Sequence, residues 1–526
     1  METVLIDGQW RAAQASSSFR ADNPSTRQPL VPEYPISTWS DCDAALTAAA
    51  QAAWQLRSVK AEQIGAFLDD FAARIEAHRD ELVAIAHAES GLPKAPRLAD
   101  VELPRTTAQL RSAAQAAREG TWSMPTIDSK NNIRSYFAAI GPVCVFGPNN
   151  FPFAFNSAAG GDFAAAIAAG NPVIAKANSS HPGTTRSLAA LAFEAVEATG
   201  MPPATVQLLY RTNHEDGERL VADARVGATG YTGSRQAGLK LKAAADQTGK
   251  PIYLELSSVN PVVILPGALK ERLDDIVGQF VTSCLMGAGQ FCTNPGLVIL
   301  LRSESLEHFV GAVAQKFLAT PSGTLLSKSV ATNLQHGIAA LQKAGAKTIM
   351  GDGPLDNTRY THPNTLLTVS GAEFLAKPHE LQTEAFGNAA LFVIADDLNQ
   401  ACAVIDQLEG SLTGYVYSGN EGSDDVSYLR VADHLRPKVG RLLNDKMPTG
   451  VAVSAAMNHG GPYPATGHPG FTAVGIPASL HRFAVLQCFD GVRAPRLPEI
   501  LRDKNPGGRA WRYIDGSWSR GDLPPQ

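Results

Sequence analysis

Charged residues are few in this sequence, and neither sign dominates. They make up 18% of the 526 residues, and the formal net charge is −5. This balance gives no electrostatic reason to expect a nucleic acid or an anionic membrane surface as a partner. No uninterrupted apolar run approaches the roughly 20 residues that a membrane-spanning helix needs. The N-terminal residues also lack the basic and apolar segments of a secretory signal, so we expect none.

Cysteine is scarce as well, and its spacing argues against two kinds of site. No Cys-x-x-Cys pair occurs among the six cysteines, which are Cys42, Cys144, Cys284, Cys292, Cys402 and Cys488. Without such pairs we expect neither a metal cluster nor a disulfide framework, and the composition favours a reducing compartment. The sequence therefore predicts a cytoplasmic protein with no bound metal.

What is present is a long alternation of buried-strand runs and helices. The first series includes the runs 143–146 and 173–176, and a second series begins near residue 262. Alternation at this spacing predicts parallel sheets with helices on both faces, an architecture that binds nucleotides at the carboxyl ends of its strands. We predict an α/β fold with two doubly wound, Rossmann-like domains and a small β element. The expected divisions are 1–120 with 139–256, then 257–480, and 121–138 with 481–526.

Three segments near the C-terminus complete this division. The Gly- and Pro-rich segment 444–477 is expected to be a long loop packed over a cleft. Residues 485–492 are expected to form an edge strand that pairs outside its own domain. The tail, residues 502–526, is rich in Arg, Gly and Pro, and we expect a weakly determined surface segment there.

Cys292 is distinguished from the other cysteines by its place in the chain. It lies on a Gly-containing connection between a predicted helix, 273–285, and a predicted strand, 297–301. A thiol on such a connection can face a cleft, and it can act as a nucleophile where its surroundings favour the thiolate. Taken alone, the same pattern is more simply explained by an ordinary half-buried cysteine.

Two polar residues could assist a nucleophile. Glu255 ends a predicted strand between Leu254 and Leu256, and a carboxylate in apolar surroundings suits a general base near neutral pH. A structural ion pair is the alternative for it. Asn150 lies in a Pro-rich turn after the strand 143–146, where its amide could donate to a developing oxyanion or simply form the turn.

Four segments taken together resemble the aldehyde dehydrogenase superfamily, and the resemblance covers about residues 1–515. The turn 148–152 is similar to the family's Pro-Trp-Asn-Phe-Pro, with Asn149 in place of Trp. Residues 254–258 resemble Leu-Glu-Leu-Gly-Gly with two serines for the glycines, and 289–292 resemble Gly-Gln-x-Cys. Residues 384–388 resemble Glu-x-Phe-Gly-Pro with Asn in place of Pro. These departures do not touch the reacting groups.

The resemblance implies a role for each candidate residue. Cys292 would be the nucleophile and Glu255 the general base, while Asn150 and the backbone N–H of Cys292 would form an oxyanion hole. The resemblance also implies a nicotinamide cofactor. Its adenosine ribose, pyrophosphate and nicotinamide ribose would be contacted, in that order along the chain, by Lys176, Ser179, Gly233, Ser234, Arg235, Gly238, Glu384 and Phe386.

The choice of cofactor is predicted from two of these residues. Ser179 stands three residues after Lys176, where an acid would repel a 2′-phosphate, and Arg235 would add a cation. Both favour NADP, with NAD as the alternative. The segments 102–111, 176–183 and 459–466 resemble an NADP-preferring branch of the family. That branch includes α-ketoglutarate semialdehyde (2,5-dioxopentanoate) dehydrogenases and a fatty-aldehyde dehydrogenase.

From this resemblance we predict that an aldehyde is oxidised to a carboxylic acid through a Cys292 thiohemiacetal and thioester. The loop 451–466 and the segment 505–516 favour α-ketoglutarate semialdehyde as the substrate, although residues 466–468 depart from that branch. Fatty or other small aldehydes are the alternative. A CoA-acylating enzyme would not need Glu255, and a non-catalytic structural protein would not need the nucleophile, the base and the oxyanion hole together.

The substrate end and the assembly are predicted more loosely. Arg105 and Gln109 share a helical face at spacing four, and with His459 they are candidates to contact an acidic aldehyde. A solvated surface cation is the alternative for Arg105. The resemblance also implies a homodimer or homotetramer that assembles through the edge strand 485–492.

Overall fold

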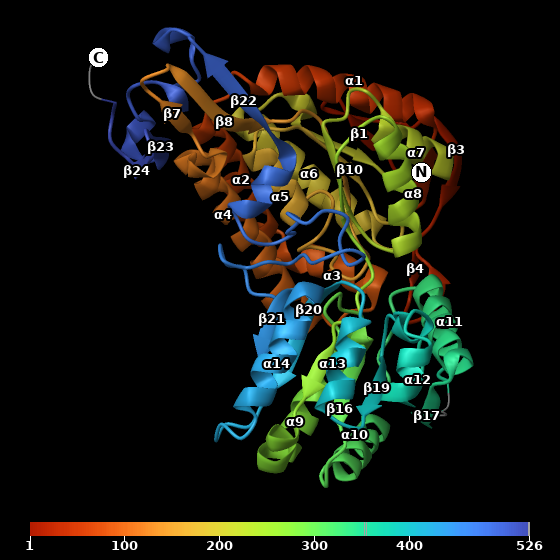
Figure 1. The fold of residues 1–526 in the computed structure, drawn as a ribbon. Helices are drawn as coiled ribbons and strands as arrows, with labels where there is room; N and C mark the ends of the chain where they lie inside the picture. Colours follow the sequence, from red (N-terminus) through yellow and green to blue (C-terminus); the bar gives the residue numbers. More distant parts are fainter. Residues whose placement is uncertain (352, 354, 524–526) are drawn as a thin grey trace.

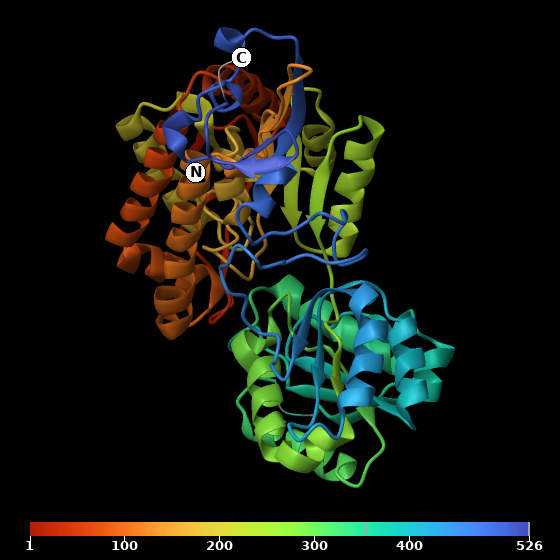
Figure 2. The ribbon, with the colours of Figure 1, turned by 60° about the vertical axis from the view of Figure 1, so that its left-hand side comes forward.

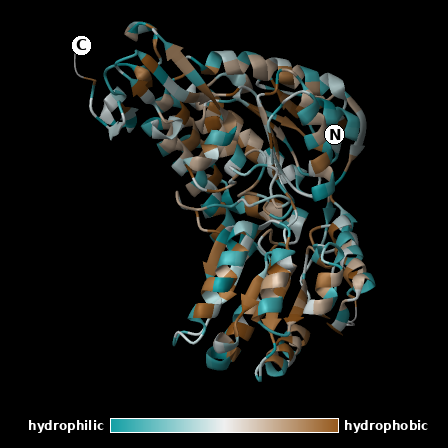
Figure 3. Cartoon of the chain, in the orientation of Figure 1, coloured by the Kyte–Doolittle hydropathy of each residue, from teal (hydrophilic) through white to brown (hydrophobic). Residues whose placement is uncertain are grey.

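The structure is a computed structural model that describes residues 1–351, 353 and 355–523. Figure 1 shows two large lobes, each built on a central sheet, and a smaller sheet beside the upper lobe. Hydrophobic residues concentrate in the strands of both lobes (Figure 3), where helices cover the two faces of each sheet. None of the helices within the described ranges is long and apolar enough to span a membrane.

The upper lobe holds a seven-stranded sheet in the order β14-β13-β9-β10-β11-β1-β2. The strands from β14 to β11 are parallel, whereas β1 is antiparallel to both of its neighbours. Their bounds are β1 Val4–Ile6, β2 Gln9–Arg11, β9 Val143–Phe146, β10 Val173–Lys176, β11 Val206–Leu209, β13 Ala228–Thr232 and β14 Ile252–Glu255. The predicted strands 143–146 and 173–176 thus have the bounds that the sequence indicated.

Helices pack on both faces of this sheet (Figure 1), as its doubly wound order requires. They are α1 Trp39–Leu56, α2 Ala61–Ala77, α3 Arg79–Ser90, α4 Leu103–Glu119, α5 Gly161–Ala168, α6 Pro182–Thr199, α7 His214–Ala222 and α8 Arg235–Gln247, with the short helix η1 Lys94–Glu102 before α4. Two small sheets border the lobe, formed by β3 Ala15–Phe19, β6 Tyr34–Ser37 and β12 Arg211–Thr212, and by β4 Asp22–Asn23 and β5 Gln28–Pro29.

The lower lobe repeats the architecture with the order β17-β18-β19-β16-β15-β20-β21, in which only the pairing of β17 with β18 is antiparallel. The strands are β15 Val262–Ile264, β16 Leu297–Leu301, β17 Lys347–Met350, β18 Thr365–Ser370, β19 Ala389–Ala395, β20 Ser411–Tyr417 and β21 Val439–Asn444. The helices are α9 Pro266–Leu285, α10 Leu306–Ala319, α11 Lys328–Ala344, α12 Gly371–Ala376, α13 Leu398–Asp406 and α14 Asp425–Leu435.

The third sheet joins segments from the middle and the end of the chain, in the order β22-β8-β7-β23-β24. The strands are β7 Thr126–Asp128, β8 Ile133–Ala139, β22 Ala484–Asp490, β23 Arg512–Ile514 and β24 Ser517–Ser519. β22 lies at the edge, and Leu486 on it is 60% exposed. Assembly into a homodimer or homotetramer through this edge stays a prediction, which light scattering from the full-length protein tests.

The expectation of a weakly determined tail is wrong for the described residues 502–523. Strands β23 and β24 form a hairpin that extends the third sheet, and the side chain of Arg512 is completely buried. Its guanidinium donates to the backbone carbonyls of Arg502, Asp503 and Gly521. A buried cation that satisfies three carbonyls fixes the surrounding backbone, which composition alone did not indicate. Residues 524–526 of the predicted tail lie outside the described residues.

The segment 444–477 runs between the two lobes (Figure 2), in agreement with the predicted loop. It is attached to the end of β14 by backbone hydrogen bonds from Leu256 N to Ala465 O at 2.8 Å and from Gly467 N to Leu254 O at 3.0 Å. These bonds make Thr466 an antiparallel β-bridge partner of Glu255, so the loop pairs briefly with the end of β14. The loop is therefore held directly beside Glu255, where its side chains can enter the cleft between the lobes.

Candidate active site

Cys292 lies on the turn that connects α9 to β16, as predicted, and a glycine makes this turn possible. Gly289 has a φ of +69°, and a Cβ atom built on it would lie 2.1 Å from the carbonyl oxygen of Gly387. Any other residue at position 289 would therefore force two backbone segments apart. Asn260 fixes the same turn, because its Nδ2 donates to the carbonyls of Cys292 and Asn294, each at 2.9 Å.

The thiol meets the predicted general base through a histidine. Cys292 Sγ lies 3.3 Å from Nε2 of His459, and the same nitrogen lies 3.0 Å from Oε1 of Glu255. His459 and Glu255 are both almost fully buried, while Cys292 is half-buried. The structure thus places His459 at the reacting centre, deeper than the substrate-end position expected for it.

The resting thiol is protonated. Burial raises the pKa of Cys292 well above its ordinary value, the charge of Glu255 raises it further, and the charge of Arg105 opposes the change. A nucleophilic thiolate therefore forms only if a nearby group accepts the proton during attack. His459 Nε2 lies at hydrogen-bond distance from both the thiol and Glu255, so the ring can relay that proton to the carboxylate.

Asn150 is held where its amide faces the Cys292 turn. Its Nδ2 donates to the carbonyl of Gln290 at 3.0 Å, which uses one of the two amide hydrogens. The second hydrogen remains available to the oxyanion that forms when the sulfur attacks a carbonyl carbon. Arg97 steadies the turn from the other side, because its Nη2 donates to the carbonyl of Asn150 at 3.0 Å.

Arg97 and Glu102 are site residues that the sequence reasoning missed. Glu102 is buried, pairs with Arg97, and accepts hydrogen bonds from the backbone N–H groups of Phe153 and Ala154 at 2.8 and 3.0 Å. Together they anchor the turn that carries the Asn150 amide. A charged pair five residues apart on a Pro-containing segment is common in solvent, so the sequence offered no signal for this role.

Aromatic rings line the cleft beside the thiol, and Arg105 packs against them. Phe151 has ring contacts with Phe155 and Phe291 at 5.1 and 5.5 Å, and the Arg105 guanidinium lies 5.3 Å from the Phe155 ring. Arg105 is half-buried, and its Nε and Nη2 are enclosed without a hydrogen-bond partner among the described residues. The solvated-cation interpretation of Arg105 is therefore wrong.

Gln109 has a different place from the one expected. Its Nε2 donates to the carbonyl of Ala154 at 3.1 Å, and its side chain is buried. The amide nitrogen is thus already used to support the Asn150 turn from helix α4. We expect Gln109 to act on the substrate pocket through that turn, with only its Oε1, which lacks a partner within the described part of the chain, left for a further contact.

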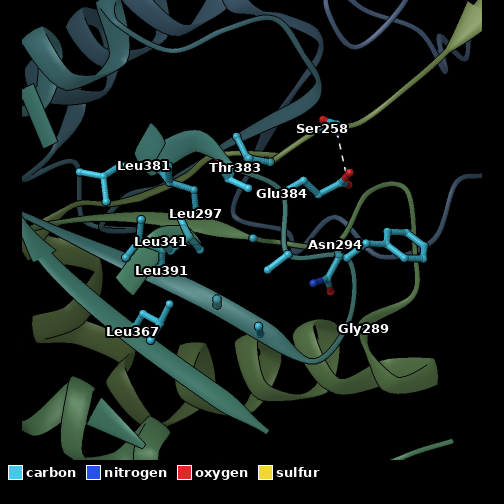
Figure 4. Close-up of a pocket in the computed structure, with 16 residues that line it drawn as sticks. Ser258, Gly289, Asn294, Leu297, Leu341, Leu367, Leu381, Thr383, Glu384 and Leu391 are labelled. Atoms are coloured by element: carbon cyan, nitrogen blue, oxygen red, sulfur yellow. Dashed lines mark hydrogen bonds between the residues drawn. The ribbon is translucent and has the colours of Figure 1, made fainter. Parts of the chain in front are cut away.

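The second wall of the cleft carries the predicted ribose ligand, Glu384. Figure 4 shows its carboxylate directed toward Ser258, whose backbone N–H donates to Oε1 at 3.4 Å. Burial raises the pKa of Glu384 to about 7, although hydrogen bonds from Ser257 and Ser258 oppose the change. Glu384 and Phe386 line one cavity together. A neighbouring cavity of about 270 Å³ is bordered by Arg235, Ser257, Glu384 and Glu409 among others.

Lys176 ends β10 at the carboxyl edge of the upper sheet, as predicted, and Ser179 follows three residues later. Burial, together with the positive charge of Arg211, lowers the pKa of Lys176 to about 8. Arg211 comes two residues after Leu209, the parallel register partner of Lys176, so both cations lie at the same edge. The sequence reasoning missed Arg211, although its position directly after strand β11 could have signalled it.

The turn before α8 differs from expectation in the use of its glycines. The backbone N–H of Gly233 donates to the carbonyl of Glu255 at 3.1 Å and is therefore not free for a phosphate. A Cβ on Gly238 would lie 2.5 Å from Leu256 Cδ2, so this glycine serves helix–strand packing. Ser234 caps α8, and the first turn of that helix remains a favourable place for a pyrophosphate.

Arg235 does not present the free cation that was predicted. Its Nη1 forms an ion pair with Oε2 of Glu409 at 2.8 Å, across the cleft from the lower lobe. This pairing neutralises the charge that a 2′-phosphate would use. Lys176 and Arg211 lie at the carboxyl edge of the upper sheet, so the prediction of NADP no longer rests on Arg235.

These groups fit a nicotinamide nucleotide between the lobes. Lys176 lies at the carboxyl end of β10, and helix α8 begins after β13 in the same sheet, both of them places where parallel sheets bind nucleotides. The buried carboxylate of Glu384, in surroundings that disfavour its charged form, suits a pair of ribose hydroxyl donors. The cofactor cleft and the Cys292 turn thus meet at one place, as an aldehyde-oxidising enzyme with a thiol nucleophile requires.

The sequence matches the aldehyde dehydrogenase family over residues 10–462, and the chain belongs to that family. It is an oxidoreductase that acts on aldehydes and uses a nicotinamide cofactor. The chain is 38% identical to alpha-ketoglutaric semialdehyde dehydrogenase 2 of Azospirillum brasilense, over 95% of this chain and 97% of the relative. It is 34% identical to the alpha-ketoglutaric semialdehyde dehydrogenase of Acinetobacter baylyi, over 95% of this chain and 96% of the relative.

Solved structures share the fold. Lactaldehyde dehydrogenase from Escherichia coli superposes with a TM-score of 0.80 at 22% identity, covering 93% of this chain and 98% of that one. An aldehyde dehydrogenase from Bacillus cereus in complex with NAD+ superposes with a TM-score of 0.79 at 20% identity, covering 93% of this chain and 96% of that one. Both confirm the predicted architecture of two Rossmann-like lobes.

Proposed function

We propose that this enzyme oxidises α-ketoglutarate semialdehyde to α-ketoglutarate with NADP. The observation that carries the substrate assignment is Arg105, whose Nε and Nη2 have no partner in the described part of the chain and whose guanidinium packs on the aromatic wall beside the nucleophile. The relatives from Azospirillum brasilense and Acinetobacter baylyi, both named for this substrate, support it. The aromatic wall alone would also suit an uncharged aldehyde, which makes such aldehydes the comparison in the test below.

The first step is attack by Cys292 on the aldehyde carbon. As the S–C bond forms, His459 Nε2 takes the thiol proton and can pass it to the carboxylate of Glu255, 3.0 Å away. The carbonyl oxygen becomes an alkoxide, which the free amide hydrogen of Asn150 stabilises. The product of this step is a thiohemiacetal on Cys292. A nicotinamide cofactor held by Lys176 and Glu384 would supply the hydride acceptor that turns this thiohemiacetal into a thioester.

Glu255 then serves the hydrolysis of that thioester. Once the proton taken from the thiol has left to solvent, the Glu255 carboxylate can remove a proton from water and return it through His459 to the Cys292 sulfur. The oxygen of the tetrahedral intermediate returns to Asn150, and collapse of that intermediate releases the acid and regenerates the thiol. A water-activating carboxylate is unnecessary for transfer to CoA, so Glu255 supports hydrolysis over acylation of CoA.

Recognition of the acidic tail is assigned to Arg105. Its Nε and Nη2 are enclosed and have no partner among the described residues, which is costly for a cation unless a substrate anion completes the hydrogen bonds. Burial lowers the pKa of Arg105, while the carboxylates of Glu102 and Glu255 raise it, so the guanidinium shares their electrostatic surroundings. A guanidinium stays protonated in such a site and can bind a carboxylate through two hydrogens.

Replacing Arg105 with alanine is expected to raise KM for α-ketoglutarate semialdehyde about 10- to 100-fold, because a charge-assisted hydrogen bond is lost. KM for pentanal, which has no carboxylate, is expected to change less than about threefold. Steady-state kinetics with both aldehydes measures the difference. Arg111→Ala is the matched control, because Arg111 on the same helix is 45% exposed and pairs with Glu76. Equal KM changes for the two aldehydes would refute the role of Arg105 in binding the substrate carboxylate.

The NADP preference is assigned to Arg211 together with Lys176 and Ser179. Arg211→Ala is expected to lower kcat/KM for NADP at least about tenfold and to leave that for NAD within about twofold, because only NADP carries the 2′-phosphate. Arg235→Ala is the control, and it is expected to leave the ratio of the two values unchanged, since Glu409 already neutralises Arg235. Initial rates with each cofactor give kcat/KM for NADP and NAD in the wild type and in both variants. A wild-type preference for NAD would reject the assignment.

A further inference from the structure

The groups around Cys292 have the donor set of a zinc site. One ligand atom each of Cys292, His459 and Glu255 lies within 4.8 Å of the other two. Sulfur, imidazole nitrogen and carboxylate oxygen are the three ligand types that Zn²⁺ takes in proteins, whereas Mg²⁺ and Ca²⁺ favour oxygen alone. Three protein ligands with a fourth position left for water is a common zinc arrangement.

The separations suit a single ion of this size. Sγ to Nε2 is 3.3 Å, and Nε2 to Oε1 is 3.0 Å. With zinc bonds of about 2.3 Å to sulfur and about 2.0 Å to nitrogen and oxygen, a tetrahedral site separates these pairs by about 3.6 and about 3.3 Å. The observed pairs would open by about 0.3 Å each, which small side-chain rotations supply.

The three side chains also present more lone pairs than they have hydrogens to share. Nε2 of His459 can carry one hydrogen at most, yet it faces both Sγ and Oε1. Glu255 is 2% exposed, and its second oxygen, Oε2, has no hydrogen-bond partner among the described residues. This orphaned buried oxygen is an independent sign that the cluster can accept a cation.

One nearby charge works against a metal ion and limits its affinity. Arg105 shares the electrostatic surroundings of Cys292 and Glu255, so its positive charge opposes a second cation. His459 Nδ1 is buried without an acceptor in the part of the chain that the structure describes, so the ring lacks the second hydrogen bond that orients the imidazole in most zinc sites. Both features favour an exchangeable ion over a permanently bound one.

We propose that Cys292, His459 and Glu255 bind one Zn²⁺ per chain, and that the bound ion reversibly blocks the nucleophile. On binding, the thiol releases its proton to solvent and a zinc–sulfur bond forms, with no change in oxidation state. The half-buried position of Cys292 leaves the ion a route from the aldehyde side. Binding itself does not depend on the proposed substrate or cofactor, and only the loss of activity does.

Direct metal binding tests the proposal without any use of activity. Titration of the metal-free, full-length enzyme with ZnCl₂ in a calorimeter is expected to give one site per chain. Titration with CoCl₂ is expected to produce a thiolate-to-cobalt charge-transfer absorption. Zinc is also expected to protect Cys292 from iodoacetamide, as read by peptide mass spectrometry, and a chelator is expected to restore the labelling. No uptake of either metal would overturn the proposal, even in an enzyme that oxidises aldehydes.

Variants separate this site from adventitious binding. His459→Asn is expected to weaken zinc binding at least about 100-fold and to abolish the cobalt–thiolate band, because a direct ligand is lost. Glu255→Gln is expected to weaken binding at least about tenfold and serves where His459→Asn does not fold. Cys488→Ser is the matched control, since this exposed thiol lies outside the cluster. Unchanged affinity in both cluster variants, or its loss in Cys488→Ser, would refute the proposal.

Discussion

Replacing Cys292 with serine is expected to lower kcat for aldehyde oxidation by about 10⁴-fold or more. The hydroxyl is a far weaker nucleophile than a thiolate, and the surrounding groups are spaced for sulfur, with His459 at 3.3 Å. Asn150 and the cofactor cleft remain in this variant, so binding of NADP is expected to persist within about threefold. Initial-rate kinetics and fluorescence titration of the reduced cofactor measure the two properties.

Cys488→Ser is the control for this change, because that cysteine is exposed on strand β22. It is expected to retain the wild-type rate. A Cys292→Ser enzyme that kept more than about a tenth of the wild-type kcat would show that Cys292 is not the nucleophile.

Replacing Glu255 with glutamine is expected to lower kcat about 10²- to 10⁴-fold by blocking thioester hydrolysis. Thiol attack and hydride release precede that step, so the variant is expected to form about one equivalent of reduced cofactor per chain in a rapid burst and then nearly stop. Stopped-flow absorbance at the reduced-nicotinamide band measures the burst. If the transfer of the thiol proton through His459 to Glu255 limits the rate instead, the burst itself slows in proportion to kcat.

The two outcomes therefore assign Glu255 between two steps of the reaction. A full burst with slow turnover places its main contribution in hydrolysis. A burst slowed as much as turnover places it in activation of Cys292. A variant with wild-type turnover would exclude both roles and would leave the water without a base.

Much of the fold was predictable because parallel strands covered on both faces must be continuously apolar. The runs 143–146, 173–176 and 297–301 therefore define their strands to the residue. Strands β17 and β18 escaped prediction. Lys347–Met350 is an exposed edge segment, and its polar residues resemble a turn until tertiary pairing with β18 decides the outcome.

The candidate site was only partly visible in the sequence. Cys292, Glu255 and Asn150 each follow a predicted element in a motif, so their meeting at one sheet edge could be anticipated. The contact between His459 and Glu255 joins residues 204 positions apart through a loop without periodicity, and no local pattern specifies it. The pairing of Arg235 with Glu409 crosses the two lobes in the same way, and it reversed a charge argument that the local sequence had suggested.

A covalent adduct on Cys292 tests the central claim most directly. The Glu255→Gln enzyme is mixed with NADP and α-ketoglutarate semialdehyde, quenched in acid and mapped by peptide mass spectrometry. We predict a thioester on the peptide that contains Cys292. The mass of that peptide then increases by the mass of the aldehyde minus two hydrogen atoms, one lost from the thiol and one from the aldehyde carbon. We also predict that no thioester forms without NADP. An unmodified Cys292 after a burst of reduced cofactor, or an acyl group on another residue, would contradict the account.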